Sequence, residues 1–231
     1  MIRPVRRLLH RGLFITFEGT EGSGKTTQMR LLSERLRKCG YPVTENQEPG
    51  ATRIGRQIRR ILLDPAHEEM APLTELLLMF ASRTQAAAEI ITPALNRGDI
   101  VVSDRFTDST LAYQGDGRRL GFEIVRKAHQ LALGDLQPDL TLCIEIDIEM
   151  GLSRARNRNQ RSLRKAREAR LDRQSLDFHR RVAEGYKTIA ALEPQRFRLI
   201  DGRDDPETVA GRVWAEVSPL LSKIQKQAVN S

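Results

Sequence analysis

The sequence predicts an α/β protein built on a doubly wound, five-stranded parallel sheet with helices on both faces. Short apolar runs alternate with longer amphipathic segments, which is the pattern of strand–helix units rather than of hairpins. A glycine-rich turn follows the first run, and turn sequences border the later ones. The expected strands are Leu13–Glu18, 41–44, Ile100–Asp104, 140–146 and Phe197–Asp201.

The glycine-rich turn after the first strand matches a phosphate-binding loop. Residues 19–26 fit the pattern G-x-x-x-x-G-K-[ST], in which glycines let backbone N–H groups approach phosphate oxygens. Lys25 can reach the outer phosphates of a nucleotide, and the Thr26 hydroxyl can hold a magnesium ion. The next segment, Lys25–Lys38, has helical periodicity and would point its positive dipole end at the same phosphates. We therefore expect a P-loop NTPase-type sheet that binds a nucleotide here.

The other helices follow from apolar periodicity. A central helical region is expected over 73–94, and amphipathic helices over 123–133 and 207–221. Phe80 is equally compatible with core packing and with ligand stacking. Arg83 lies three residues further on a similar helix face, and an arginine beside an aromatic ring suits a flat base with carbonyl acceptors.

The stretch DIVVSDRF ends a buried strand with two charged residues. A strand that ends in Asp104 is what a phosphate-loop protein uses to orient its Mg²⁺ shell, so Thr26 and Asp104 are the expected metal residues. The chain turns at this point, so Arg105 could reach the same cleft and bind phosphate; the alternative is a surface Asp–Arg pair.

Composition bounds the class of protein. A chain of 231 residues with 39% hydrophobic and 29% charged residues suits one folded domain, expected over 12–231. Its apolar runs fall short of the ~20 residues that span a bilayer, so we expect no membrane association. Cys39 and Cys143 lack metal-ligand spacing and are expected to be reduced, buried thiols of a cytoplasmic protein.

The net charge of +8 is concentrated in two segments rather than spread evenly. Residues 1–11 hold four arginines and are expected to be a flexible basic extension, with a transit peptide as the alternative. Nine Lys and Arg residues fall between Arg154 and Arg173. Aromatic residues make up only 5% of the chain, which disfavours a single-strand nucleic-acid binder, so no nucleic acid partner is expected.

Several motifs in order resemble the thymidylate kinase family, which converts dTMP and ATP to dTDP and ADP. They are FEGTEGSGKTTQ, the EPG turn followed by Ile58 and Arg59, LLLMFASR, DRFTDSTLAYQG, PDLTLCIEID, GLSRARNR and DFHRRVAEGY. The resemblance runs from Gly12 to the C-terminus. It implies ATP and dTMP as substrates, Mg²⁺ as cofactor and a homodimer.

The resemblance also implies roles for particular residues. ATP would bind on Gly19, Thr20, Glu21, Gly22, Ser23, Gly24, Lys25, Thr26 and Thr27. The dTMP site would comprise Glu21, Glu48, Arg59, Phe80, Arg83, Arg105, Tyr113 and Gln114. Within that site, Arg59 and Arg105 would clamp the monophosphate, and Phe80 would stack on thymine. Arg83 and Gln114 would read the base, Tyr113 would crowd the sugar 2′ position, and Glu21 would lie near the 3′-hydroxyl.

A mobile lid over about 153–173 is implied as well. The phosphate loop has Gly22 where some members carry an arginine, so Lys25 and Arg105 would be joined as catalytic residues by lid arginines: Arg154, Arg156 and Arg158. Residues two apart on a helix diverge by roughly 200°, so these three cannot all face the phosphates.

The chain departs from the family pattern in three places. Gln47 and Ala51 flank EPG where an arginine and a second glycine are common. Residues 82–86 replace a DR-x-QH pattern, and residues 169–172 replace DRFE at the end of the lid, where Arg170 keeps the arginine.

Two other functions fit parts of the pattern. Another nucleotide or deoxynucleoside kinase would share the loop and differ in base preference. A phosphate-loop ATPase could instead grip nucleic acid with the arginine-rich stretch, although basic runs alone are weak evidence.

Overall fold

The computed structural model describes residues 12–162 and 168–229, with side chains to Leu221. The expected basic extension, 1–11, lies outside the described residues. So do residues 163–167 in the middle of the expected lid.

The predicted parallel sheet is confirmed. Five strands, β1 (Leu13–Glu18), β2 (Val43–Gln47), β3 (Ile100–Asp104), β4 (Leu140–Glu145) and β5 (Phe197–Asp201), form one sheet in the order β2-β3-β1-β4-β5. Every neighbouring pair is parallel. The sequence misplaced one strand, because β2 begins at Val43 and continues through the polar residues Thr44, Glu45, Asn46 and Gln47. It lies at the edge of the sheet. Continuous apolar runs are expected of strands that are buried on both faces, so an edge strand can be polar.

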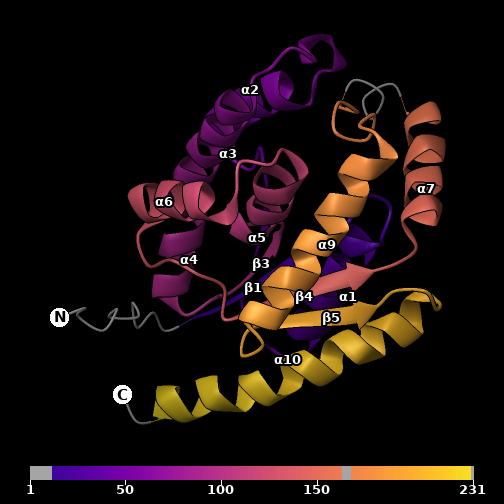
Figure 1. The fold of residues 1–231 in the computed structure, drawn as a ribbon. Helices are drawn as coiled ribbons and strands as arrows, with labels where there is room; N and C mark the ends of the chain where they lie inside the picture. Colours follow the sequence, from indigo (N-terminus) through magenta and orange to yellow (C-terminus); the bar gives the residue numbers. More distant parts are fainter. Residues whose placement is uncertain (1–11, 163–167, 230–231) are drawn as a thin grey trace.

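Helices cover both faces of the sheet (Figure 1). Helices α1 (Lys25–Lys38) and α10 (Pro206–Val229) pack against each other on one face. Strand alternation points Leu13, Ile15 and Phe17 into the core beneath them. On the other face lie α3 (Pro72–Ala86), α4 (Thr92–Arg97), α5 (Thr107–Thr110), α6 (Phe122–Leu133) and α9 (Leu176–Leu192).

Two further helices rise beyond the sheet. Helix α2 (Arg53–Leu63), followed by a 3₁₀ turn (Pro65–His67), packs on α3. Helix α7 (Ile148–Gln160) stands apart from this pair, with the upper part of α9 between them (Figure 1). No helix in the described part of the chain is long and apolar enough to cross a membrane.

The central helical region is longer and less regular than expected. Helix α3 widens into a π-helical turn at Ala87–Ile91, and α4 then continues to Arg97. Pro93 has no N–H to donate to the preceding turn, and a π-helical turn accommodates the lost hydrogen bond. A second π-helical segment, Leu111–Gly117, follows α5 and packs on α9.

One expectation about the cysteines is wrong. Cys143 is buried in β4, but Cys39 is exposed, and both are free thiols. Cys39 is the C-cap of α1 and follows Leu36, the last buried residue of that helix.

Candidate active site

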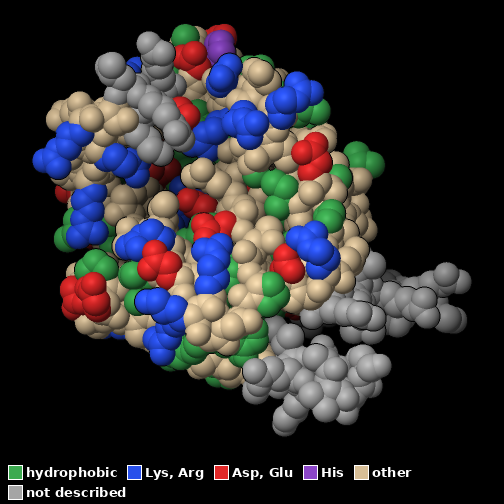
Figure 2. Space-filling model, turned by 180° about the vertical axis from the view of Figure 1, so that it is seen from behind, with side chains coloured by type: hydrophobic (Ala, Val, Ile, Leu, Met, Phe, Trp, Pro, Cys, Tyr) green, Lys and Arg blue, Asp and Glu red, His purple; other side chains and the backbone are tan. Residues whose placement is uncertain are grey.

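A cavity of about 460 Å³ opens at the carboxyl ends of β1, β2 and β3. This is the edge at which ligands bind in sheets of this kind. Its walls come from the phosphate loop, the turn after β2, helices α2, α3 and α7, the segment 104–114, and residues 168–172. Acidic and basic side chains are interspersed on the face of the molecule seen from behind (Figure 2).

The structure brings most of the expected residues to this one cavity. Its lining includes Glu21, Gly22, Ser23, Gly24, Lys25, Thr26, Thr27, Glu48, Arg59, Arg83, Asp104, Arg105, Tyr113, Gln114, Arg154 and Arg158. Gly19 and Thr20 lie in the same loop but do not line the cavity. Phe80 and Arg156 are not in the wall.

The phosphate loop depends on glycine at positions with positive φ. Gly22 has φ 68°, and a Cβ there would lie 2.2 Å from the carbonyl oxygen of Gly151 on α7. A Cβ at Gly19 would lie 2.4 Å from the Ile144 carbonyl. A larger residue at 22 would therefore push α7 away, so an arginine cannot be supplied from this position without displacing that helix.

Lys25 lies folded over its own loop. Its Nζ donates hydrogen bonds to the carbonyl oxygens of Gly19 at 2.9 Å and Thr20 at 2.7 Å. Burial, together with the nearby positive charge of Arg105, lowers the pKa of Lys25 to about 8. The two carbonyl oxygens that Lys25 contacts carry only partial negative charge. A bound phosphate would offer this ammonium group a fully charged partner.

Thr26 and Asp104 form the oxygen pair expected for Mg²⁺. The Thr26 hydroxyl donates to Asp104 Oδ2 at 3.1 Å, beside the loop. The described residues hold no cluster of three or more His, Cys, Asp or Glu side chains that could cage a metal. This donor set fits Mg²⁺, which keeps several waters and is shared with substrate phosphates.

Arg105 turns from the end of β3 into the cavity. Its backbone has φ 72°, a conformation uncommon for a side-chain-bearing residue. Its Nη2 donates to the Tyr113 hydroxyl at 3.1 Å and lies 3.8 Å from Glu21 Oε1. Asp104 and Arg105 therefore face one cleft, and the alternative of a surface pair does not hold.

Glu21 is a buried, ionised acceptor on the cavity wall. The Tyr113 hydroxyl donates to its Oε1 at 2.6 Å, and His179 Nδ1 lies 3.1 Å from its Oε2. Burial opposes ionisation, but His179, Arg105 and Lys25 outweigh it and lower the pKa of Glu21 to about 2. The carboxylate is thus available to accept a hydrogen bond from a ligand hydroxyl.

A second buried pair lies deeper in the cavity. Arg83 Nε donates to Glu48 Oε2 at 2.5 Å, and Arg83 Nη1 donates to the Thr110 hydroxyl at 2.9 Å. Burial raises the pKa of Glu48, although Arg83 counteracts this shift. The remaining donors and acceptors of this group suit a planar ligand with carbonyl and imide edges.

Phe80 is placed differently from the expectation. It lies in the core and not in the cavity wall, with its ring 6.4 Å from His129 and 5.3 Å from the guanidinium carbon of Arg83. Met79, one residue earlier, lines the cavity instead. Neighbouring positions on a helix point about 100° apart. The sequence did not show how α3 would be turned about its axis, so it could not tell which of the two side chains would face the cavity.

Arg59 is already paired with an acidic side chain. Its Nη2 donates to Glu168 Oε2 at 2.8 Å, and its Nη1 donates to the Pro49 carbonyl at 2.7 Å. Glu168 follows the undescribed part of the expected lid. A phosphate that bound Arg59 would meet this carboxylate at the same guanidinium edge.

The three arginines expected in the lid do not all face the cavity, as helix geometry requires. Arg154 and Arg158, one turn apart on α7, line the cavity, whereas Arg156 does not. Arg158 Nη2 also lies 3.4 Å from Asp172 Oδ2.

Arg170, which keeps the arginine of the family's lid motif, is buried away from the cavity. It donates to the Leu62 carbonyl at 2.6 Å and to Glu75 Oε2 at 2.6 Å. It therefore fastens the end of the expected lid segment to α2 and α3.

Sequence reasoning missed the residues that support this site. Glu75 accepts hydrogen bonds from Gln114, Arg118 and Arg170. His179 contacts Glu21 from α9, far away in sequence. The motif DFHRRVAEGY marked α9 without indicating which of its side chains would turn toward the loop.

Taken together, a phosphate loop, a Thr–Asp pair and a facing group of arginines around one cavity define a P-loop phosphotransferase acting on a nucleotide. The family model described as thymidylate kinase matches residues 17–213. The chain belongs to the thymidylate kinase family.

Individual relatives agree with this assignment. The chain is 48% identical over 206 residues to a thymidylate kinase of Pelobacter propionicus, covering 89% of this chain and 94% of that protein. It is 47% identical over 217 residues to one of Geobacter sulfurreducens, covering 94% and 100%. The crystal structure of thymidylate kinase from Ehrlichia chaffeensis superposes with a TM-score of 0.72 at 32% identity, covering 90% of this chain and 98% of that one.

Proposed function

We propose that the cavity is where the chain carries out the reaction of its family, transfer of the γ-phosphoryl group of ATP to dTMP to give dTDP and ADP. One observation carries this assignment: Lys25 of the phosphate loop and Arg105 of the opposite wall face the same 460 Å³ space. Donor and acceptor phosphates bound on these two sides would meet between them. Holding them in line supplies most of the catalysis that phosphoryl transfer requires.

On the donor side, the loop N–H groups and the N-terminus of α1 would hold the ATP phosphates. Thr26 and Asp104 would hold Mg²⁺, which would supply positive charge to the phosphates. Lys25 would stabilise charge on the transferring group. No protein base is required, because the attacking oxygen of dTMP is already ionised.

On the acceptor side, Arg59 and Arg105 would bind the monophosphate through their planar guanidinium groups. Glu21 would accept a hydrogen bond from the 3′-hydroxyl of the sugar, and Tyr113 beside it would exclude a 2′-hydroxyl. The support for these roles is that all four side chains line the same cavity.

For thymine we propose Arg83, Gln114 and the apolar side chain of Met79, which replaces Phe80 in this role. Met79→Ala is expected to raise the KM for dTMP by about 10- to 200-fold, the range expected for lost apolar contact in a pocket. Phe80→Leu is expected to lower thermal stability with little change in that KM. Steady-state kinetics and thermal unfolding of both variants distinguish the two positions.

Helix α7 carries the first part of a proposed lid over about 153–173. Arg154 and Arg158 would complete the positive charge around the transferring phosphoryl, and closure would exclude water that hydrolyses ATP. The support is that both line the same cavity as the acceptor arginines.

The assignment is tested by coupled ADP release with ATP and each nucleoside monophosphate in turn. We expect dTMP to be the best acceptor and dUMP to be weaker by about 10- to 200-fold, since it lacks one methyl group. A higher kcat/KM for dGMP, AMP or CMP would refute dTMP as the substrate. Salt-sensitive DNA binding by the intact chain would instead favour the nucleic-acid ATPase.

We also propose a homodimer that acts in the cytoplasm, where both nucleotides and two free thiols would be expected. The support for a dimer is a set of exposed apolar side chains on the adjacent helices α2, α3 and α6: Ile54, Ile61, Leu73, Leu77, Ile124 and Leu131. Light scattering should show a dimer that Leu77→Glu dissociates. Leu192→Glu is the matched control, because both leucines are 57% exposed and Leu192 lies on α9.

A further inference from the structure

One buried carboxylate beneath the cavity has no role in the binding scheme above. Glu18 ends β1, and strand alternation directs it with Phe14 and Thr16 toward the face covered by α5 and α9. Its side chain is fully buried and does not line the cavity. It therefore cannot contact either substrate directly.

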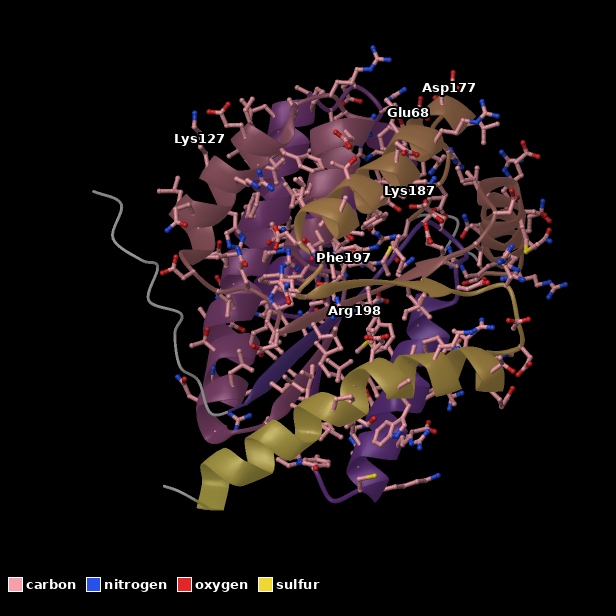
Figure 3. All side chains as sticks on the ribbon, turned by 60° about the horizontal axis from the view of Figure 1, so that its bottom comes forward. Glu68, Lys127, Asp177, Lys187, Phe197 and Arg198 are labelled. Carbon is pink, nitrogen blue, oxygen red and sulfur yellow. The ribbon has the colours of Figure 1, made fainter. Side chains whose placement is uncertain are left out.

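Three donors converge on this carboxylate. The hydroxyls of Ser109 and Tyr186 both donate to Glu18 Oε2, the second at 3.0 Å. The backbone N–H of Phe106 donates to Oε1 at 2.8 Å. Packing holds the tyrosine in place, because its ring lies 6.3 Å from that of Phe197. Figure 3 labels Phe197 on β5.

The same two hydroxyls also touch Arg105. Its Nη1 donates to Ser109 Oγ at 2.9 Å and to the Tyr186 oxygen at 3.2 Å. A hydroxyl has one proton, so a hydroxyl that donates to Glu18 presents only lone pairs to the guanidinium group. The ionised carboxylate thereby determines the direction of both hydroxyls.

We propose that Glu18 is a positioning residue for phosphoryl transfer: acting through Ser109 and Tyr186, it holds the Arg105 guanidinium in the orientation that binds the acceptor phosphate. This inference rests on the proposed role of Arg105 in the acceptor site. The arrangement leaves Nη2 directed toward the cavity side, where it contacts the Tyr113 hydroxyl.

The ionisation of Glu18 offers a way to observe this link. Burial, and next the negative charge of Asp108, raise the pKa of Glu18 to about 7, while Arg105 counteracts the shift. The other ionisable groups that interact with it are Lys25 of the phosphate loop, Cys143 of β4 and Tyr186 of α9. Protonated Glu18 would resemble glutamine in shape and hydrogen bonding.

The experiment compares wild type with Glu18→Gln by the ratio of their kcat/KM values for dTMP between pH 5.5 and 9. Titration of dTMP and of groups common to both proteins cancels in this ratio. We expect wild type to exceed the variant by about ten- to a hundredfold at pH 8 to 9, the range for lost hydrogen bonds to charged groups. The ratio should fall toward one below pH 7. A ratio independent of pH would overturn the inference.

Glu145→Gln is the matched control, because Glu145 ends the adjacent strand β4 and does not line the cavity. Its ratio to wild type should stay near one at every pH. If Glu18→Gln does not fold, Tyr186→Phe removes one of the two bridging hydroxyls and keeps the ring. It should lower kcat/KM for dTMP at pH 8 by about tenfold; unchanged kinetics would overturn the inference.

A double-mutant cycle separates positioning from a general structural effect. If Glu18 acts through Arg105, Glu18→Gln should have almost no further effect on kcat/KM in the Arg105→Lys background. Equal effects in both backgrounds would refute the link. Arg105→Lys by itself tests the underlying role, because near-normal kinetics of that variant would remove Arg105 from the acceptor site.

Discussion

Replacement of Glu75 tests how the far wall of the cavity is held. This carboxylate on α3 is completely buried and accepts four hydrogen bonds. Gln114 and Arg118 donate from the segment after β3, and Arg170 donates from the end of the lid segment. Glu75→Ala removes all of these contacts and leaves their donors without an acceptor.

The size of the effect follows from which donors water can reach. The Arg118 side chain is 18% exposed and can be rehydrated, whereas the Arg170 side chain is 1% exposed and would keep, among the described residues, the Leu62 carbonyl as its acceptor. Removing one partner of a buried ion pair costs about 3–5 kcal/mol. Each kcal/mol lowers the Tm of a domain of this size by about 2–4 °C. We therefore expect a loss of roughly 6–20 °C.

The assay is thermal and urea-induced unfolding at pH 7.5. Burial opposes ionisation of Glu75, but Arg118, Gln114 and Arg170 outweigh it and lower the pKa of this carboxyl. Its stabilising contribution is therefore present above about pH 4.5, the ordinary pKa of a glutamate, and is lost as the pH falls through the folded-state pKa. The difference between wild type and Glu75→Ala should shrink at pH 3.

Two comparisons make the result decisive. Glu34→Ala is the surface control, because Glu34 pairs with Arg30 on the exposed side of α1 and should cost at most about 0.5 kcal/mol. The double variant Glu75→Ala/Arg170→Ala should lose less stability than the sum of its single variants, because it no longer buries an unpaired charge. A loss below about 1 kcal/mol for Glu75→Ala, or strict additivity, would refute the reasoning.

Three further predictions concern the loop, the lid and the pH dependence of stability. Lys25→Ala should lower kcat by at least about a hundredfold, while circular dichroism shows an intact fold; retained turnover would contradict its role. Arg154→Ala and Arg158→Ala should lower kcat by about 10²- to 10³-fold with little change in the KM for ATP. The kinetics of Arg156→Ala should stay close to those of wild type. Equal small losses of kcat at all three positions would exclude the lid role. The pKa of Glu18 is raised in the folded state from 4.5 to about 7, so its contribution is complete below pH 4.5 and is lost as the pH rises to 7. Relative to Glu18→Gln, wild type should therefore lose about 2.5 kcal/mol of unfolding free energy between pH 5 and 8, measured with urea; a constant difference would disprove the buried titration.

The sequence determined the parts of this protein that depend on neighbouring residues. The bounds of β1, α1, β3 and β5 were predicted because strand and helix periodicities are local, and the glycine pattern after β1 specified the phosphate loop. The polar edge strand β2 begins two residues later and ends three residues later than predicted, since its sequence has no continuous apolar run.

The tertiary structure alone decided which side chains share the cavity and which support it. Met79 rather than Phe80 faces the ligand space because the rotation of α3 about its axis is set by the packing of α2 and α6 against it. The contact between Glu18 and Tyr186 joins residues 168 positions apart, and no periodicity or motif spacing encodes such a separation. Local sequence patterns can specify a helix or strand and the loop beside it. The partners of a buried charge depend instead on how distant elements pack. A charge removed from water needs hydrogen bonds, and the fold determines which side chains can supply them.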